Sequence, residues 1–199
     1  MLTMYDDINL DAIPADAQAV AGYVNGRWPN YDESVRRFPK AKHLSIAVSS
    51  AADADCLDVE RFDATNAVAP GWVKRQLKRG VHRPVLYTSV SNVAALLREL
   101  SSSGVQRSQV RVWSAHYTER AHLCGPSCGF GMPTVADATQ WTSHSHGRSL
   151  DQSLCSDTFF GLAPKPLKHS GLWRNSVADV GRTLIWNPAK RLFTLKRKG

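Results

Sequence analysis

Residues 57–65 have the sequence LDVERFDAT, which joins a short apolar run to a group of acidic side chains. The run CLDVE, residues 56–60, is typical of a short buried strand bounded by turns. Asp58 and Glu60 lie two positions apart, so on a strand both side chains point to the same side. The segment therefore predicts a strand that ends in a pair of carboxyl groups.

On both sides of this segment, candidate strands alternate with helical patterns. Further strands are expected at residues 2–7, 19–26, 43–50, 83–89, 110–117, 138–142 and 149–155. Helices are expected at 31–38, 69–80 and 91–104, and the last two end at a glycine. Repeated strand–helix units favour an α/β fold with a parallel sheet.

The number of candidate strands is large for the length of chain that holds them. A complete eightfold barrel usually takes about 250 residues. Here eight strands fall within residues 1–160, so some of the usual helices must be missing. No strong helical pattern lies between the last three strands, and we expect the missing helices there.

The net charge of +8 is confined to the C-terminal part of the chain. Lys and Arg number 25 against 17 Asp and Glu, with a pI of about 9.6. Residues 1–160 carry 16 side chains of each sign, whereas residues 161–199 carry nine basic side chains and Asp179 alone. We therefore predict a charge-neutral body over 1–160 and a basic linker and tail over 161–199.

The basic tail begins with GLAPKPLKHSG, residues 161–171, whose prolines and glycines are typical of a linker. Beyond it we expect at most one short helix before Pro188. The tail contains no recognisable DNA-binding motif, so we do not expect nucleic-acid binding. We expect it either to stay solvated or to dock on a protein partner, for example in a virion.

Four acids share a position at or near the end of a predicted strand: Asp6, Asp58, Glu60 and Asp151. In a barrel of parallel strands the carboxyl ends meet on one face, where active sites form. Converging carboxyls cannot all ionise at low cost, so at least one keeps its proton. A protonated carboxyl beside an ionised one suits glycoside hydrolysis. The alternative is that these acids are solvated or cap the helices that follow.

Six pieces of the sequence carry a family resemblance, and they occur in the family's order: MYDDIN (4–9), LDVERFDAT (57–65), PVLYTS (84–89), VRVWSAHYT (110–118), ATQWTS (138–143) and SLDQSL (149–154). Together they resemble the glycoside hydrolase family 25 muramidases, and more closely the glycoside-hydrolase-like domains of actinobacteria and their phages. The resemblance implies an α/β fold, an irregular TIM-like (β/α) barrel of about eight strands and five helices. In this chain a basic C-terminal extension follows it.

The resemblance also implies roles for the acids. Glu60 matches the general acid, Asp58 the neighbouring carboxylate that positions and stabilises, and Asp6 and Asp151 the remaining acids. The implied substrate is the β-1,4 bond between N-acetylmuramic acid and N-acetylglucosamine in peptidoglycan. The first-strand motif departs from the family, because Asp7-Ile8-Asn9 stands where x-Ser and a Gln are usual. The first-strand acid is therefore either Asp6 or Asp7.

Aromatic and amide side chains near the strand ends fit a sugar-binding cleft. Sugar rings stack on aromatic faces, and amides or phenols bond hydroxyl groups. For Trp113 we favour packing in the core. The candidate substrate-binding residues are Tyr87, Tyr117, Gln140 and Trp141.

The segment HYTERAHLCGPSCGFG, residues 116–131, holds two histidines and two cysteines, and TSHSHG adds His144 and His146. Cys124 and Cys128 could ligate zinc, form a local disulfide or remain free thiols. Because no second cysteine pair accompanies them, we expect free thiols, no metal and no cofactor.

The sequence contains no apolar run near the roughly 18 residues of a membrane span, and its start lacks a secretory signal pattern. We expect a protein that stays in the cytoplasm until lysis or is carried in a virion, and that acts at the cell wall. The main alternative to a hydrolase is a non-hydrolytic structural or wall-binding component of a phage tail that retains the fold.

Overall fold

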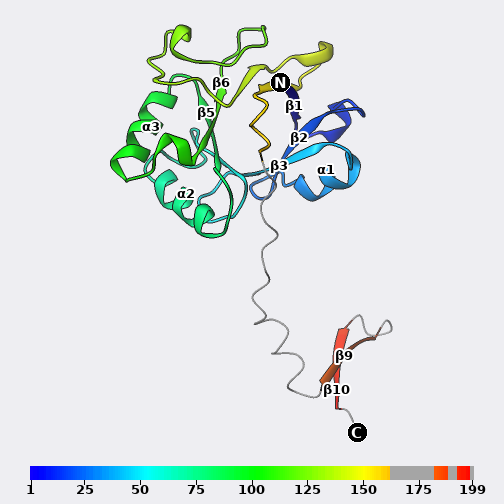
Figure 1. Cartoon of the computed structure of the whole chain (residues 1–199). Helices are drawn as coiled ribbons and strands as arrows, with labels where there is room; N and C mark the ends of the chain where they lie inside the picture. Colours follow the sequence, from blue (N-terminus) through cyan, green and yellow to red (C-terminus); the bar gives the residue numbers. More distant parts are fainter. Residues whose placement is uncertain (162–181, 188–191, 198–199) are drawn as a thin grey trace. The chain divides into compact units, whose positions relative to one another are not determined.

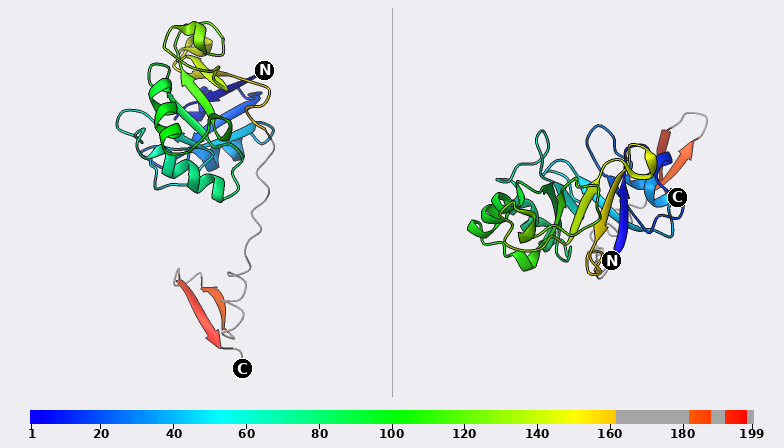
Figure 2. Two further views of the ribbon diagram at one scale, coloured as in Figure 1. Left: turned by 60° about the vertical axis from the view of Figure 1, so that its left-hand side comes forward. Right: turned by 90° about the horizontal axis from the view of Figure 1, so that it is seen from above.

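The computed structural model describes residues 1–161, 182–187 and 192–197. The chain divides into two compact units, Met1–Pro164 and Lys165–Gly199. In the first unit, eight strands close into a barrel in sequence order (Figures 1 and 2). The strands are β1 (Leu2–Asp6), β2 (Ala19–Tyr23), β3 (Lys42–Ala47), β4 (Cys56–Asp58), β5 (Val85–Ser89), β6 (Arg111–Ala115), β7 (Ala138–Thr142) and β8 (Asp151–Cys155).

The direction of the last strand corrects the expectation of an all-parallel sheet. Strands β1 to β7 run parallel, but β8 is antiparallel to both of its neighbours, β7 and β1. A parallel crossover needs a dozen or more residues, and only residues 143–150 separate β7 from β8. The chain therefore turns back and closes the barrel with one reversed strand.

Three α-helices cover the barrel within residues 1–161: α1 (Tyr31–Arg37), α2 (Ala69–Lys78) and α3 (Val93–Ser102). This is fewer than the five that the resemblance implies. The connections after β6 and β7 hold only short 3-10 turns, Pro126–Cys128 and Ser145–Gly147, as the weak helical pattern there predicts. Two more 3-10 turns are Leu10–Ala12 and Arg107–Gln109.

The two longer helices form where their apolar spacing and end signals predict them. In α3, Val93, Leu96 and Leu100 share one buried face. The chain leaves α3 through Gly104 at a φ of +79°, a conformation that glycine adopts without strain. Helices α2 and α3 pack together on one side of the barrel, while α1 packs on β2 and β3 (Figure 1).

Alternate strand residues fill the inside of the barrel. They form one buried apolar cluster, and the strands that contribute its members lie all around the barrel. A second cluster lies between the outer face of the sheet and helices α2 and α3. The interior cluster consists of Met4, Ala19, Ala21, Leu44, Ile46, Cys56, Val85, Trp113, Ala138, Cys155 and Phe159.

The second unit contains two paired strands, β9 (Arg182–Asn187) and β10 (Leu192–Arg197). They are antiparallel, with Leu192 opposite Asn187 and Arg197 opposite Arg182. The residues directly before Pro188 therefore form a strand where a short helix was expected. The rest of that expected helix and the linker at 162–171 lie outside the described residues. In the described part of the chain, no helix has the length and apolar character that crossing a membrane requires.

Candidate active site

The barrel brings the four predicted acids to one end. Asp6 and Asp58 are the last residues of β1 and β4, and Glu60 follows β4 by two residues. Asp151 is the first residue of β8 and not near its end, which corrects the sequence-based placement. Because β8 is reversed, its start lies at the same end of the barrel, and Asp151 pairs with Asp6 in the ladder.

The structure separates the two candidate acids of the first strand. Asp6 is buried, with 4% of its surface exposed, and it continues the inward-facing series of Leu2 and Met4. Asp7 is only partly buried, and its carboxylate accepts the backbone N–H of Asn9 at 2.6 Å. Asp6 is therefore the acid that faces the other carboxyls, while Asp7 closes the turn after β1.

Burial and repulsion from neighbouring acids raise the pKa values of the two deepest acids, Asp6 and Asp58. Loss of water raises the pKa of Asp6 well above its usual range, and the charges of Asp151, Asp58 and Asp7 raise it further. Burial, followed by the charges of Glu60 and Asp63, raises the pKa of Asp58 to about 8. One oxygen of Asp6 and one of Asp58 are buried without a hydrogen-bond partner within the described residues.

Asp151 ionises more easily than Asp58, because its pKa is lower. Burial and then the charge of Asp7 raise its pKa, while a hydrogen bond from Gln140 and the charge of His144 lower it, with a net value of about 6. Gln140 itself is 1% exposed, and it accepts a hydrogen bond from the hydroxyl of Tyr87. Gln140 therefore lies beneath the open surface, where it connects Tyr87 to the acid cluster.

Glu60 lies at the rim and is exposed to solvent. Partial desolvation, the charge of Asp63 and then that of Asp151 raise its pKa. Glu60 lines a hollow of about 540 Å³, together with Asn66, Asn92 and other residues that follow β4 and β5. Asp6, Asp58 and Asp151 do not line this hollow, so Glu60 is the acid most open to an incoming molecule.

The candidate aromatic residues differ in how accessible they are. Tyr117 is 54% exposed two positions after β6, whereas Tyr87 is half-buried with its ring 4.5 Å from that of Trp113. Burial and then the neighbouring Tyr117 raise the pKa of Tyr87. Trp113 is buried, as expected, and its indole N–H donates to Ser153 at 3.0 Å. Trp141 is half-buried beside a bulge in β7.

Three side chains at this end were not singled out from the sequence. Tyr23 ends β2 among the acids, and burial followed by the charges of Asp6, Asp58 and Asp151 raises its pKa. Phe62 and Trp28 are exposed by 90% and 54%, and they line a second hollow of about 450 Å³ with Asp63. Phe62 also has a φ of +79°, which is strained for a bulky residue. In AVAGY, Tyr23 follows the same alternation as the inward-facing Ala19 and Ala21, and this pattern could have identified it. The sequence offers no comparable pattern for Phe62.

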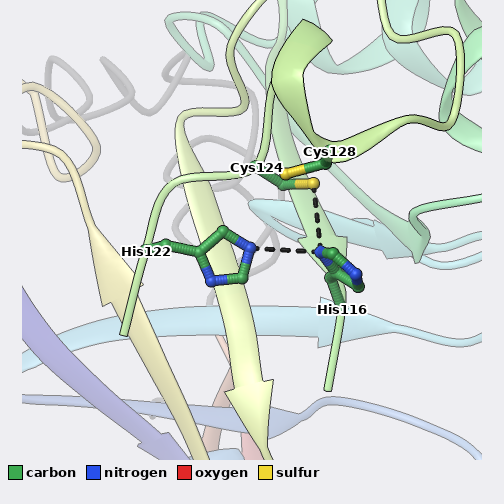
Figure 3. A group of neighbouring side chains, drawn as sticks. All are labelled: His116, His122, Cys124 and Cys128. Atoms are coloured by element: carbon green, nitrogen blue, oxygen red, sulfur yellow. Dashed lines mark hydrogen bonds between the residues drawn. The ribbon is translucent and has the colours of Figure 1, made fainter. Parts of the chain in front are cut away.

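The histidines and cysteines of the β6–β7 connection form a separate group. Cys124 and Cys128 are free thiols, and His116 and His122 lie beside them (Figure 3). The remaining cysteines, Cys56 and Cys155, are buried within the barrel.

Comparisons with known proteins support the fold. The sequence matches no protein-family model and no curated protein. Among solved structures, one similar chain is an uncharacterized protein of B. stearothermophilus, with a TM-score of 0.54 and 15% identity over 80% of this chain and 98% of that one. Another is a bacterial lysozyme from Streptomyces coelicolor, with a TM-score of 0.52 and 13% identity over 82% of this chain and 97% of the lysozyme. The barrel is thus lysozyme-like in its fold.

Proposed function

We propose that the barrel is a peptidoglycan hydrolase of the muramidase type, which cleaves the β-1,4 bond between N-acetylmuramic acid and N-acetylglucosamine. The observation that carries this proposal is the gathering of Asp6, Asp58, Glu60 and Asp151 at one end of the barrel. Within the described residues, none of these carboxyls forms a salt bridge. Burial and repulsion between such acids raise their pKa values, so a protonated carboxyl can stand beside an ionised one, as glycoside hydrolysis requires.

In the proposed mechanism, Glu60 is the proton donor. Its raised pKa keeps more of it protonated than an ordinary glutamate, and its exposed position lets a glycosidic oxygen approach. As the bond between the sugar C1 and that oxygen breaks, the proton of Glu60 passes to the leaving sugar. Water then adds to C1, and its proton returns to Glu60.

The remaining acids act on the charge that develops at the sugar. With a pKa of about 6, Asp151 is ionised at neutral pH and can stabilise positive charge on the ring. Asp58, with a pKa of about 8, stays protonated and can donate a hydrogen bond. The role of Asp58 is therefore positioning in its neutral form, a refinement of the carboxylate role that the resemblance implies.

The exposed aromatic side chains around the acids provide surfaces for sugar rings. We assign Tyr117, Phe62 and Trp28 to stacking, because each is more than half exposed near this end of the barrel. Tyr87 and Gln140 are held below the surface and support the acids. Trp141 remains a candidate contact at the bulge of β7.

The decisive experiment compares the full chain with its Glu60→Gln variant on purified cell walls. We expect the unaltered protein to release reducing ends, and we expect Glu60→Gln to lose at least about a hundredfold in rate. Reduction of the products followed by mass spectrometry identifies the terminal sugar. A muramic acid terminus supports the proposed bond, whereas a glucosamine terminus contradicts it.

The matched control is Glu33→Gln, which makes the same carboxyl-to-amide change at an exposed position of α1. This variant should keep full activity. If the unaltered chain binds several wall types but cleaves none of them, the enzyme proposal fails and a non-hydrolytic wall-binding role replaces it.

The pH profile tests the assignment of Glu60 as the acid. Because the charge of Asp63 raises the pKa of Glu60, Asp63→Asn should move the alkaline limb of the activity profile to lower pH. An unchanged alkaline limb would show that Glu60 does not set it.

A further inference from the structure

The connection between β6 and β7 is long and has no α-helix. It covers residues 116–137, and within it the only regular element is the 3-10 turn Pro126–Cys128. Connections of this length without their own secondary structure are uncommon in compact domains and are often functional when they are ordered. Here four side chains converge: His116, His122, Cys124 and Cys128, whose nearest nitrogen and sulfur atoms all lie within 4.8 Å of one another (Figure 3).

We propose that these four residues bind one zinc ion. Two imidazole nitrogens and two thiolates are a ligand set that zinc takes in tetrahedral structural sites. The sites for the proposed wall hydrolysis and for zinc use different residues, so this proposal does not depend on the enzymatic one.

The distances agree with the edges of a zinc tetrahedron. Zinc–nitrogen bonds of about 2.05 Å and zinc–sulfur bonds of about 2.3 Å imply edges of roughly 3.3 Å between nitrogens and 3.6 Å between nitrogen and sulfur. In the structure, Nδ1 of His116 is 3.1 Å from Nε2 of His122 and 3.4 Å from Sγ of Cys124. The side chains are thus already spaced like metal ligands.

Proton counting shows that hydrogen bonds hold the sulfur atoms of this group only weakly. The Nδ1–H of His122 donates to the carbonyl of Arg120 at 2.8 Å, which leaves Nε2 of a neutral His122 as an acceptor. Nδ1 of His116 faces both this acceptor and the Cys124 thiol. With a proton, this nitrogen can donate to Nε2 of His122 and only weakly to the sulfur of Cys124, and without a proton it opposes the lone pair of Nε2. A metal ion satisfies all of these atoms together.

The surroundings hold the ligands in place. The bond from His122 to Arg120 fixes the ring with Nε2 toward the site, as is usual for metal-bound histidines. The backbone N–H of Cys124 donates to Thr139 on β7 at 2.8 Å, and the ring of His116 packs edge-on against Phe130. Cys124 is buried in a cluster with Val112 and Met132, and Cys128 packs against that cluster.

Four protein ligands leave no open position, so we assign the zinc a structural role and not a catalytic one. It would fasten the β6–β7 connection to the end of β6, since His116 directly follows that strand. Tyr117 is the next residue, so the same ion would fix the backbone that carries this exposed ring at the acid end.

The test begins with the metal content of the full chain. We expect purified protein from zinc-supplemented cells to hold about one zinc per chain after gel filtration. Replacing the zinc by Co²⁺ should give the absorption of tetrahedral cobalt with thiolate charge-transfer bands. Chain with no bound zinc, or cobalt protein without thiolate bands, would overturn the proposal, and neither measurement needs a variant that folds.

Substitutions identify the ligands. Cys128→Ser and His122→Ala should each lower zinc retention against a competing chelator by at least about tenfold. Cys155→Ala and His82→Ala are matched controls, a cysteine inside the barrel and an exposed histidine, and should retain zinc fully. Equal retention in all four variants would place the metal elsewhere and overturn the assignment.

The competing interpretation is a disulfide between Cys124 and Cys128. Intact mass without reductant distinguishes it, because a disulfide lowers the mass by two hydrogens and removes both thiols as ligands. Unaltered mass with bound zinc supports the proposal, and a quantitative disulfide in freshly isolated protein refutes it.

Discussion

Carboxyl groups have opposite surroundings at the two ends of the barrel: they lack cations at one end and pair with arginines at the other. At the end where β1 and β4 finish, Asp6 and Asp58 are buried beside other acids, and no described cation forms a salt bridge with them. At the other end, where strands begin, Asp137 precedes β7 and bonds Arg83 at 2.9 Å and Arg107 at 2.6 Å. Asp53, shortly before β4, pairs with Arg75 and Arg79.

The acids that pair with arginines stabilise the barrel, whereas the buried acids without a cation lower its stability. A paired carboxylate with hydrogen-bond donors around it stabilises the fold in its ionised form. A buried carboxyl without a cation is tolerated mainly when it keeps its proton. Such carboxyls gather at one end of the barrel only, so acids with raised pKa values are concentrated there. This concentration is the physical basis for the proposed chemistry.

Removing the best-paired acid should have the largest effect on stability. In Asp137→Asn, Arg83 and Arg107 lose their counter-charge, and the backbone N–H of Val112 loses a charged acceptor. Because the Asp137 side chain is only 10% exposed, we expect the free energy of unfolding in urea to fall by about 2–4 kcal/mol.

An exposed acid provides the control for this change. Asp16→Asn alters an exposed carboxyl that forms no salt bridge among the described residues, and it should shift stability by less than about 0.5 kcal/mol. A loss of similar size in both variants would contradict a special role for Asp137.

Removing an unpaired acid should have the opposite sign. The pKa of Asp58 is raised to about 8 from 3.8, so the folded state binds an extra proton between these values. The stability that this binding confers is full below pH 3.8 and is lost progressively as the pH rises through about 8. Asp58→Asn cannot ionise, so we expect it to be more stable than the unaltered chain at pH 8.

The measurement is the free energy of unfolding of both chains from pH 5 to pH 9. The advantage of Asp58→Asn should grow with pH up to about pH 8 and level off above it. A constant difference across this range would mean that the carboxyl of Asp58 ionises normally in the folded protein.

The local patterns of the sequence predicted most of the barrel. Strand positions, the helices that end at Gly80 and Gly104, and the lack of helices after β6 all follow from apolar spacing and end signals. These features depend on neighbouring residues, so they can be inferred without the fold. Strand alternation predicted that Asp58 and Glu60 point to the same side of one strand, but β4 ends at Asp58, and Glu60 lies beyond it as an exposed residue.

Features that depend on closure of the barrel could not be inferred in this way. The reversal of β8, which brings Asp151 to the acid end from the start of its strand, follows from the shortness of the connection after β7. The protonation of Asp58 depends on how deeply the closed barrel buries it. The meeting of His116 with Cys124 and Cys128 depends on the path of a long connection, so spacing alone favoured free thiols.

The smallest expected effect on stability comes from the exposed ion pairs of Asp53, and its pH dependence is opposite to that of Asp58. A hydrogen bond from Gln76 and then the bond and charges of Arg75 and Arg79 lower the pKa of Asp53, outweighing partial desolvation. Its contribution is therefore present above the unfolded pKa and lost as the pH falls through the lowered folded value. The Asp53 side chain is 41% exposed, so solvent screens the pairs, and Asp53→Asn should cost only about 0.5 kcal/mol at pH 7. That cost should shrink toward pH 3, whereas the gain from Asp58→Asn grows toward pH 8. If the stability of both variants, relative to the unaltered chain, changes with pH in the same direction, the contrast between acids at the two ends of the barrel is refuted.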